Sequence, residues 1–167
     1  MPNYRRSNTK GGTYFFTVVT HHRQPIFCNE NIRNALRQAI VDTRREHPFE
    51  IDGWVLLPDH MHCIWTLPPD DRNYGMRWAR IKRHVSKHCG AIFQREELKS
   101  PSRQRRHEST LWQRRFWEHR IRGDRDFRTH MDYIHFNPVK HGIVTRVRDW
   151  PYSSFHRYVR RGVYSLD

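Results

Sequence analysis

The sequence predicts an α+β fold in which helices pack on one face of a single antiparallel sheet. Segments typical of strands and helices follow one another in the order strand, helix, strand, strand, helix, strand, helix. The second and third strands are separated only by Pro58-Asp59, a turn that suits an antiparallel hairpin. A chain of 167 residues without internal repeats can form one hydrophobic core, so we expect a single domain over residues 1–167.

Each expected strand is a run of β-branched and aromatic residues bounded by turn residues. The four runs are GGTYFFTVVT (11–20), FEIDGWVLLP (49–58), MHCIWTLP (61–68) and FWEHRIR (116–122). The first run starts at a pair of glycines, and the last alternates between apolar and polar residues. These features together predict a four-stranded sheet.

Apolar residues at helical spacing predict three helices, over residues 29–47, 71–98 and 124–136. Asn29 or Asn31 could cap the first helix, whose outer face is basic. Gly90 could interrupt the long second helix. We expect Asp124 to cap the third helix and Pro138 to stop it, because proline lacks the N–H that a helix interior needs.

Two segments lack such a pattern. Residues 99–110, KSPSRQRRHEST, are polar and contain Pro and Ser, which predicts a flexible basic loop. Residues 148–167 mix aromatic residues with arginines, and we expect this tail to pack back on the domain.

The chain is strongly basic. It contains 31 Lys and Arg residues against 17 Asp and Glu, for a net charge of +14. Because unbalanced charge repels itself within a folded domain, a polyanionic partner is one interpretation, and a charged surface that maintains solubility is the other. Arginines interleave with tryptophan and phenylalanine around residues 112–122, an arrangement that suits single-stranded or hairpin nucleic acid. Arginine stems that pack over surface aromatics would explain several of the same residues.

Other classes of protein are not indicated. The three cysteines are Cys28, Cys63 and Cys89, without C-x-x-C spacing, which fits a reduced cytoplasmic protein and not a zinc ribbon. No run approaches 18 apolar residues, and residues 1–25 hold no long apolar stretch, so we expect neither a membrane span nor a signal peptide. No P-loop or dinucleotide motif is present, so we expect no nucleotide cofactor.

His60 and His62 form a His-x-His pair inside the third expected strand. Residues two apart in a strand point to the same face, so both imidazoles should project together while Met61 faces the other way. Side-by-side imidazoles are suitable ligands for a divalent metal ion. With 13 histidines in the chain such a pair also arises by chance, so a structural pair remains an alternative.

Tyr133 and Asn137 lie four residues apart in DYIHFNP and share one face of the third expected helix. The phenol oxygen of Tyr133 could act as a nucleophile, and the amide oxygen of Asn137 could bind a hard ion such as Mg²⁺ or Mn²⁺. Taken in isolation, the simpler interpretation is structural, with a half-buried tyrosine whose hydroxyl is hydrogen-bonded and an asparagine that ends the helix before Pro138.

The order of five motifs resembles a known family. YRR...KGGTYFFTV, PFEIDGWVLLPDHMHCIW, RFWEHRIR, MDYIHFNPVKHG and DWPYSSFHRY follow one another over about residues 1–165, with only the segment near 99–110 outside the pattern. The chain is similar to the REP-associated tyrosine transposases. These are relatives of the single-tyrosine transposases of small bacterial insertion sequences, within the HUH endonucleases, where U is a bulky hydrophobic residue.

The resemblance implies a ferredoxin-like fold with the HUH motif on a central strand and the nucleophile on a facing helix. His60 and His62 match the histidine pair, Tyr133 matches the nucleophile, and Asn137 lies where relatives place a third metal ligand. The implied activity is metal-dependent cleavage and rejoining of single-stranded DNA beside hairpins of repeated extragenic palindromes (REPs), through a 5′-phosphotyrosine. The resemblance also implies a monomer, Mg²⁺ or Mn²⁺ as cofactor, and a bacterial cytoplasmic, nucleoid-associated location.

The basic N-terminal segment, residues 1–12, resembles the part of such proteins that reads a tetranucleotide at the foot of the hairpin. The residues expected to contact DNA are Arg5, Arg6, Lys10, Gly11, Gly12, Tyr14, Arg83, Lys87, Arg114, Arg115, Arg122 and Lys140. Two other functions stay open, a non-catalytic protein that binds DNA hairpins and a basic RNA-binding protein. The joint presence of His60, His62 and Tyr133 favours the enzyme, because a binding protein needs none of them.

Overall fold

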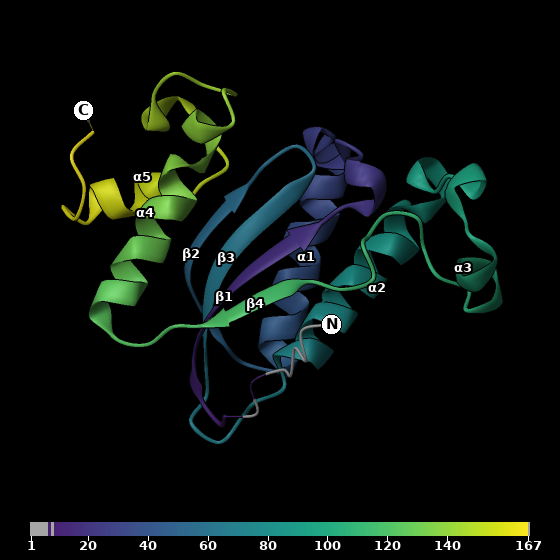
Figure 1. The fold of residues 1–167 in the computed structure, drawn as a ribbon, viewed down its shortest axis with the longest axis horizontal. Helices are drawn as coiled ribbons and strands as arrows, with labels where there is room; N and C mark the ends of the chain where they lie inside the picture. Colours follow the sequence, from purple (N-terminus) through teal and green to yellow (C-terminus); the bar gives the residue numbers. More distant parts are fainter. Residues whose placement is uncertain (1–6, 8, 167) are drawn as a thin grey trace, which may run out of the picture.

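The computed structural model describes residue 7 and residues 9–166. The strands are β1 (Gly12–Val19), β2 (Glu50–Leu56), β3 (His60–Leu67) and β4 (Trp117–Arg120). The α-helices are α1 (Glu30–Glu46), α2 (Tyr74–Phe93), α3 (Pro101–Arg105), α4 (Asp124–Lys140) and α5 (Phe155–Arg160). The expected strands and helices therefore occur in the expected order, and α3 and α5 are additional (Figure 1).

The four strands form one sheet in the order β2-β3-β1-β4, and each neighbouring pair is antiparallel. The chain order β1-α1-β2-β3-α2-β4 with this strand order is the ferredoxin-like arrangement, which confirms the expected fold. β3 lies in the interior of the sheet, and in its register with β1 His62 is opposite Thr17. The histidine pair is therefore on a central strand, as expected.

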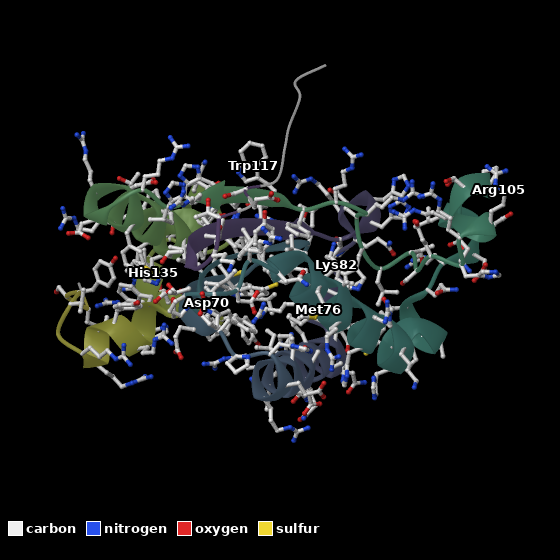
Figure 2. The ribbon with its side chains drawn as sticks, turned by 90° about the horizontal axis from the view of Figure 1, so that it is seen from below. Asp70, Met76, Lys82, Arg105, Trp117 and His135 are labelled. Atoms are coloured by element: carbon white, nitrogen blue, oxygen red, sulfur yellow. The ribbon has the colours of Figure 1, made fainter. Side chains whose placement is uncertain are left out.

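Helices cover both faces of the sheet, which corrects the expectation that they gather on one. Tyr14, Phe16 and Val18 of β1 belong to the core formed with α1 and α2. Phe15, between them in sequence, belongs to a second core with Ile134 of α4. Figure 2 shows the sheet between α4 on one side and α1 and α2 on the other. The physical reason is that β3 is buried at all but one position, so both of its faces need an apolar cover.

Asparagine side chains start the two helices of the first core. Asn29 caps α1 by accepting a hydrogen bond from the N–H of Asn31 at 2.9 Å, which decides between the two candidates. Asn73 caps α2 by accepting from the N–H of Met76 at 3.1 Å, so α2 starts three residues later than expected. Gly90 lies inside α2 without interrupting it, since a helical glycine costs only about 1 kcal/mol.

Residues 99–110, for which we expected a flexible basic loop, contain the short helix α3 at residues 101–105. Ser100 accepts a hydrogen bond from the N–H of Arg103, and Pro101 occupies the first helical position. The buried side chain of Arg103 donates to the carbonyls of Ser109 at 2.6 Å and Trp112 at 3.2 Å. A serine followed by a proline is common both at helix N-termini and in loops. The sequence pattern therefore did not distinguish a helix start from a loop here.

α4 differs from its expected form at both ends. Its N-cap residue is Gly123, and no cap side chain bonds the first turn, so Asp124 is not the cap. The helix continues through Pro138 to Lys140. The fixed φ of proline is compatible with a helix, which therefore continues with one backbone hydrogen bond fewer. The helix then ends at His141, whose N–H donates to the carbonyl of Asn137 at 3.0 Å.

The C-terminal segment lies against the outer edge of β2. Ser153 forms an isolated antiparallel bridge with Val55, and the N–H of Ser154 donates to the carbonyl of Trp54 at 2.9 Å. α5 follows directly and packs next to α4 in Figure 1. Within residue 7 and residues 9–166, no helix is long and apolar enough to cross a membrane.

Candidate active site

His60 and His62 lie side by side on the face of β3 that α4 covers. Their ring centroids are 5.0 Å apart, and both side chains are buried. Met61, between them, belongs to the opposite core with α1 and α2. The period of two residues in a strand thus produces the paired imidazoles that the sequence predicted.

Both histidines are held through the same ring nitrogen. His60 Nδ1 donates to the Asp59 carboxylate at 2.6 Å, and His62 Nδ1 lies 2.8 Å from Thr17 Oγ1. Asp59 is itself held by Arg23 at 3.1 Å. Hydrogen bonds at Nδ1 orient metal-binding histidines and leave the Nε2 lone pair for the ion. Asp59, the turn residue just before β3, therefore orients the first histidine.

Tyr133 projects from α4 toward these histidines. Its ring lies 5.2 Å from the ring of His62 in an edge-on contact and 6.0 Å from that of Phe15. The side chain remains 37% exposed, so a substrate can reach it. Lys140 Nζ lies 4.8 Å from the centroid of the Tyr133 ring.

Asn137, one turn beyond Tyr133, is fully buried, and neither its amide oxygen nor its amide nitrogen has a hydrogen-bond partner among the described residues. His62 Nε2 is buried without a partner in the same way. Buried polar atoms are almost always paired, so such orphans commonly mark an ion or a ligand. An imidazole pair and an amide oxygen are a donor set that a divalent metal ion accepts, so the residues present fit the metal that the resemblance implies.

The electrostatics of the site keep the two imidazoles neutral. Burial and, to a smaller extent, the nearby His60, His141 and Lys140 together lower the pKa of His62 to about 3. Burial also lowers the pKa of His60, against the opposing effect of its hydrogen bond to Asp59. Neutral imidazole is the form that coordinates a metal ion, so both side chains are in that form at neutral pH.

His141 is a residue of this site that the sequence analysis missed. Its ring lies 5.2 Å from that of His60, at the C-terminal cap of α4. The spacing could have indicated it, since His141 follows Asn137 by four residues and Tyr133 by eight.

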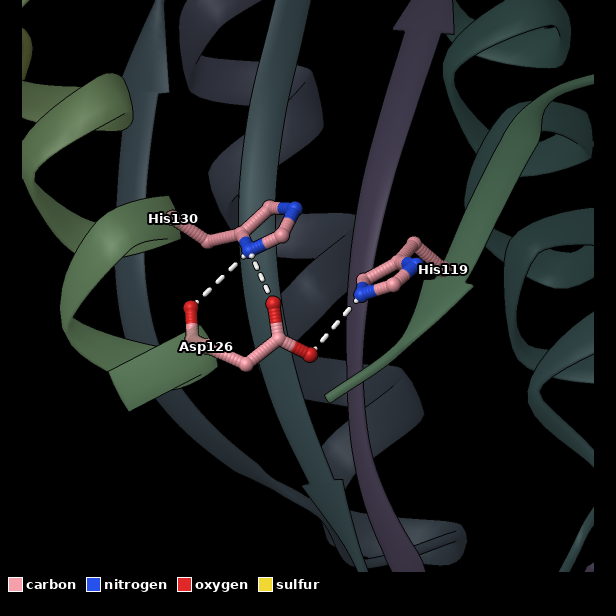
Figure 3. A group of neighbouring side chains, drawn as sticks. All are labelled: His119, Asp126 and His130. Carbon is pink, nitrogen blue, oxygen red and sulfur yellow. Dashed lines mark hydrogen bonds and ion pairs between the residues drawn. The ribbon is translucent and has the colours of Figure 1, made fainter. Parts of the chain in front are cut away.

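A second cluster of ionisable side chains was also missed. Asp126 Oδ2 accepts from His119 Nε2 at 2.9 Å, and Asp126 Oδ1 lies 2.9 Å from His130 Nδ1 (Figure 3). In the part of the chain that the structure describes, these three form the group of His and Asp ligands that could hold an ion, with ligand atoms within 4.8 Å of one another. The Asp126 carboxylate also accepts from the N–H of Arg122 at 2.7 Å, so hydrogen bonds already satisfy it. The spacing of four residues could have indicated Asp126 and His130 as a pair on α4, but not His119, which comes from β4.

Two other ionisable side chains, Glu118 and His135, have their partners away from the histidine pair. Glu118 lies in the opposite core, where it accepts from the hydroxyl of Tyr74 at 2.8 Å. His135 is turned toward the C-terminal segment, where its Nε2 lies 2.9 Å from Ser154 Oγ.

The residues expected to contact DNA are distributed over several surfaces. Arg5 and Arg6 lie outside the described residues. Tyr14 is a correction, because it is fully buried in the core and its hydroxyl donates to the carbonyl of Thr9 at 3.0 Å. Gly11 has φ +64 and its N–H donates to the carbonyl of Asp71 at 2.6 Å, which gives it a structural role at the start of β1.

The remaining expected contacts are exposed, apart from Gly12, which is half-buried with φ +92. They are Lys10, Arg83, Lys87, Arg114, Arg115, Arg122 and Lys140. Arg83 and Lys87 belong to α2, on the side of the sheet away from Tyr133. Arg114 is paired with Glu108 at 2.9 Å. Lys140, in contrast, lies against the ring of Tyr133.

A ferredoxin-like sheet with paired neutral histidines facing a helix-borne tyrosine is the arrangement expected of a single-tyrosine HUH transposase. The family comparison agrees with this class. Residues 8–137 match the family described as "Transposase IS200 like", and the chain belongs to that family.

Relatives and solved structures agree with this assignment. The chain is 47% identical over 167 residues to the REP-associated tyrosine transposase of Escherichia coli (strain K12), covering 100% of this chain and 90% of that protein. A relative from Haemophilus influenzae is 46% identical over 171 residues, covering 100% of this chain and 93% of the relative. A solved structure described as "Structure of the REP associates tyrosine transposase bound to a REP hairpin" matches with a TM-score of 0.83 and 46% identity, covering 100% of this chain and 90% of that chain.

Proposed function

We propose that this protein is a transposase that cleaves and rejoins single-stranded DNA beside REP-type hairpins, with Tyr133 as the nucleophile and a divalent metal ion as cofactor. The observation that carries the proposal is the edge-on contact of Tyr133 with His62 at 5.2 Å, together with the buried His62 Nε2 and Asn137 amide atoms, which lack partners among the described residues. The REP hairpin bound by the solved relative supports hairpin DNA as the substrate.

His60 and His62 would hold the ion through Nε2, with Asn137 Oδ1 as the proposed third ligand. A bound Mg²⁺ or Mn²⁺ would supply a Lewis acid that polarises the scissile phosphate. Asp59 and Thr17 keep the two imidazoles in the required orientation through their Nδ1 contacts. Orientation of this kind must be accurate, because small displacements at a reacting centre cost large factors in rate.

Tyr133 would attack the phosphate in line with the leaving oxygen. The tyrosine oxygen bonds to phosphorus while the bond from phosphorus to the 3′ oxygen breaks, which yields a 5′-phosphotyrosine and a free 3′-OH. One proton leaves the phenol and one joins the 3′ oxygen. Lys140, with its ammonium 4.8 Å from the ring centroid, stabilises the developing phenolate by its charge. The covalent intermediate retains the phosphodiester energy, so rejoining needs no ATP.

The decisive experiment is incubation of the protein with a single-stranded DNA hairpin and Mg²⁺ or Mn²⁺, followed by denaturing electrophoresis and mapping of the modified residue. We expect a covalent protein–DNA adduct at Tyr133 in the wild type. In Tyr133→Phe we expect no adduct and no cleavage, while the hairpin still binds in a gel-shift assay.

An RNA hairpin of the same sequence, in parallel, tests the RNA-binding alternative. Tight binding of either hairpin without any adduct would support a binding protein instead of an enzyme. Full cleavage by Tyr133→Phe would contradict the assigned nucleophile.

We also propose that the protein acts as a monomer in the bacterial cytoplasm, associated with the nucleoid where its DNA substrate lies. Light scattering of the purified chain tests the first proposal, and fluorescence microscopy of the tagged chain tests the second.

A further inference from the structure

A pocket of about 330 Å³ opens beside Tyr133. Its walls come from β1, β4 and α4, and they are formed by Phe15, Thr17, Trp117, Thr129, His130 and Tyr133. The proposed mechanism uses Tyr133 as the nucleophile. It also uses Thr17, which orients His62. The other four residues are not accounted for by the histidine pair.

The two aromatic walls of the pocket are side chains on one face of the sheet. Trp117 is opposite Thr17 in the register of β4 with β1, and Phe15 is opposite His119. Phe15 is buried, whereas Trp117 is 57% exposed although it is the largest apolar side chain of the edge strand. Figure 2 shows Trp117 standing out on the side of the sheet that carries α4. An exposed large aromatic ring at the mouth of a pocket is typical of a binding surface.

His130 is held in place at the polar wall of the pocket. Its Nδ1 lies 2.9 Å from Asp126 Oδ1 and 2.9 Å from the Asp126 carbonyl, and its ring stacks on that of His119 at 4.6 Å with an interplanar angle of 15°. Figure 3 shows the second ring nitrogen of His130 turned away from Asp126. His119 and Asp126 therefore fix the ring and leave Nε2 as the atom that a ligand can meet.

We propose that this pocket binds the nucleobase of a nucleotide next to the scissile phosphate, stacked on Trp117 with its edge against His130 Nε2. The proposal rests on the proposed function, because a strand whose phosphate reaches Tyr133 must place a neighbouring base beside it. Every base has a π-face, so stacking on Trp117 anchors the strand whatever its sequence. A hydrogen bond to His130 adds a preference among bases, since base edges differ in donors and acceptors. The pocket thus sets the register in which a phosphate meets the nucleophile.

Binding is tested with the full chain carrying Tyr133→Phe, which cannot cleave, and DNA hairpins with 2-aminopurine at successive single-stranded positions. We expect one position next to the cleavage site whose fluorescence is quenched on binding, and we expect Trp117→Ala in the same background to abolish that quenching. Trp117→Phe should retain part of it. Phe136→Ala is the matched control, because Phe136 is a 54% exposed aromatic side chain of α4 that lies outside this pocket. Quenching at no position, or quenching that survives Trp117→Ala, would overturn the proposal.

Cleavage is tested with active protein and a hairpin in which the same base is removed, leaving the sugar and the phosphates. We expect Trp117→Ala and loss of the base each to lower kcat/KM by about 5- to 100-fold, the range for loss of one stacked base. Together they should lower it little more than either change alone, because both remove the same contact. If the two changes together lower kcat/KM by the product of their separate effects, Trp117 does not contact that base. That outcome would refute the pocket while leaving the transposase function intact. Thermal melting of Trp117→Ala, compared with Trp117→Phe, checks that the edge strand is still folded.

Discussion

Thr17 and His62 face each other across β1 and β3, with Thr17 Oγ1 2.8 Å from His62 Nδ1. The contact occupies one nitrogen of the ring, and the other, Nε2, is buried without a partner among the described residues. Neighbouring strands thus determine which nitrogen of His62 is available to a metal ion. Thr17 acts through the histidine and is a positioning residue, not a ligand.

Thr17→Val should weaken metal binding by about 10-fold, because it removes the group that orients His62 and keeps a side chain of similar shape. Thr17→Ser retains the hydroxyl and should bind metal like the wild type. Titration calorimetry with Mn²⁺ measures both affinities, and cleavage at saturating Mn²⁺ should recover in Thr17→Val. Equal affinities of the valine and serine variants would show that the hydrogen bond does not orient the ligand.

His60→Ala, or EDTA added to the wild type, should lower cleavage by more than about 100-fold, because charge on the scissile phosphate is no longer stabilised. The fold should persist, since His60, although buried, is not one of the apolar side chains that form the second core. Thermal melting followed by circular dichroism measures the stability of the variant, and single-turnover kinetics measure its cleavage rate. Cleavage that continues at full rate in EDTA would argue against a metal-dependent reaction.

The pair of Asp71 and Arg77 should make stability depend on pH in the acidic range. Arg77 Nη2 donates to Asp71 at 2.6 Å, and this hydrogen bond lowers the pKa of the Asp71 carboxyl. A carboxyl whose pKa is lower in the folded state stabilises the fold above its unfolded pKa of about 3.9. That contribution disappears as the pH falls through the lower folded pKa.

Asp71→Asn should therefore destabilise the protein by about 1–2 kcal/mol at pH 7 and by progressively less below pH ~4. Urea unfolding at several pH values measures the difference. Asp70→Asn, a change at the exposed neighbour, is the matched control and should have little effect at any pH. A difference between wild type and Asp71→Asn that is constant from pH 7 to pH 2 would contradict the assignment.

Gly53 and Gly90 should respond to the same substitution in opposite directions. A Cβ at Gly53 would lie 2.5 Å from Met131 Sδ, because α4 packs closely on β2 at that point. Gly53→Ala should cost about 1 kcal/mol through overpacking, the low end of the usual range, because the flexible end of Met131 can shift. At Gly90 the nearest atom would be Gln94 Oε1 at 3.9 Å, so Gly90→Ala in α2 should stabilise the fold by up to about 1 kcal/mol. Urea unfolding of both variants tests this, and destabilisation by Gly90→Ala would be the contrary result.

The periodic parts of the sequence predicted the fold well, because local spacing decides which side chains share a face. The alternation through His60 and His62 and the helical spacing of Tyr133 and Asn137 both appear in the structure as expected. Predictions were wrong where the same short sequence is compatible with two local structures. Ser100-Pro101 starts a short helix instead of a loop, and Pro138 lies within α4 instead of ending it.

Other errors came from contacts between distant segments. Tyr14 follows a glycine pair in a basic segment and looked like a DNA contact, but the pleat of β1 turns it into the core with α2. The helices were expected on one face because an antiparallel sheet can leave the other face to solvent. The apolar residues on both faces of β3 instead require α4 as a second cover.

The sequence by itself determined the order of strands and helices, the paired imidazoles and the face of the helix that carries the tyrosine, since each follows from backbone geometry within a few residues. Only the tertiary structure decided what surrounds them. The pairing of β1 with β3 brings Thr17 to His62, and the packing of α4 brings Tyr133 to the same ring. These contacts depend on how whole elements bury their apolar faces against one another, which no local spacing encodes.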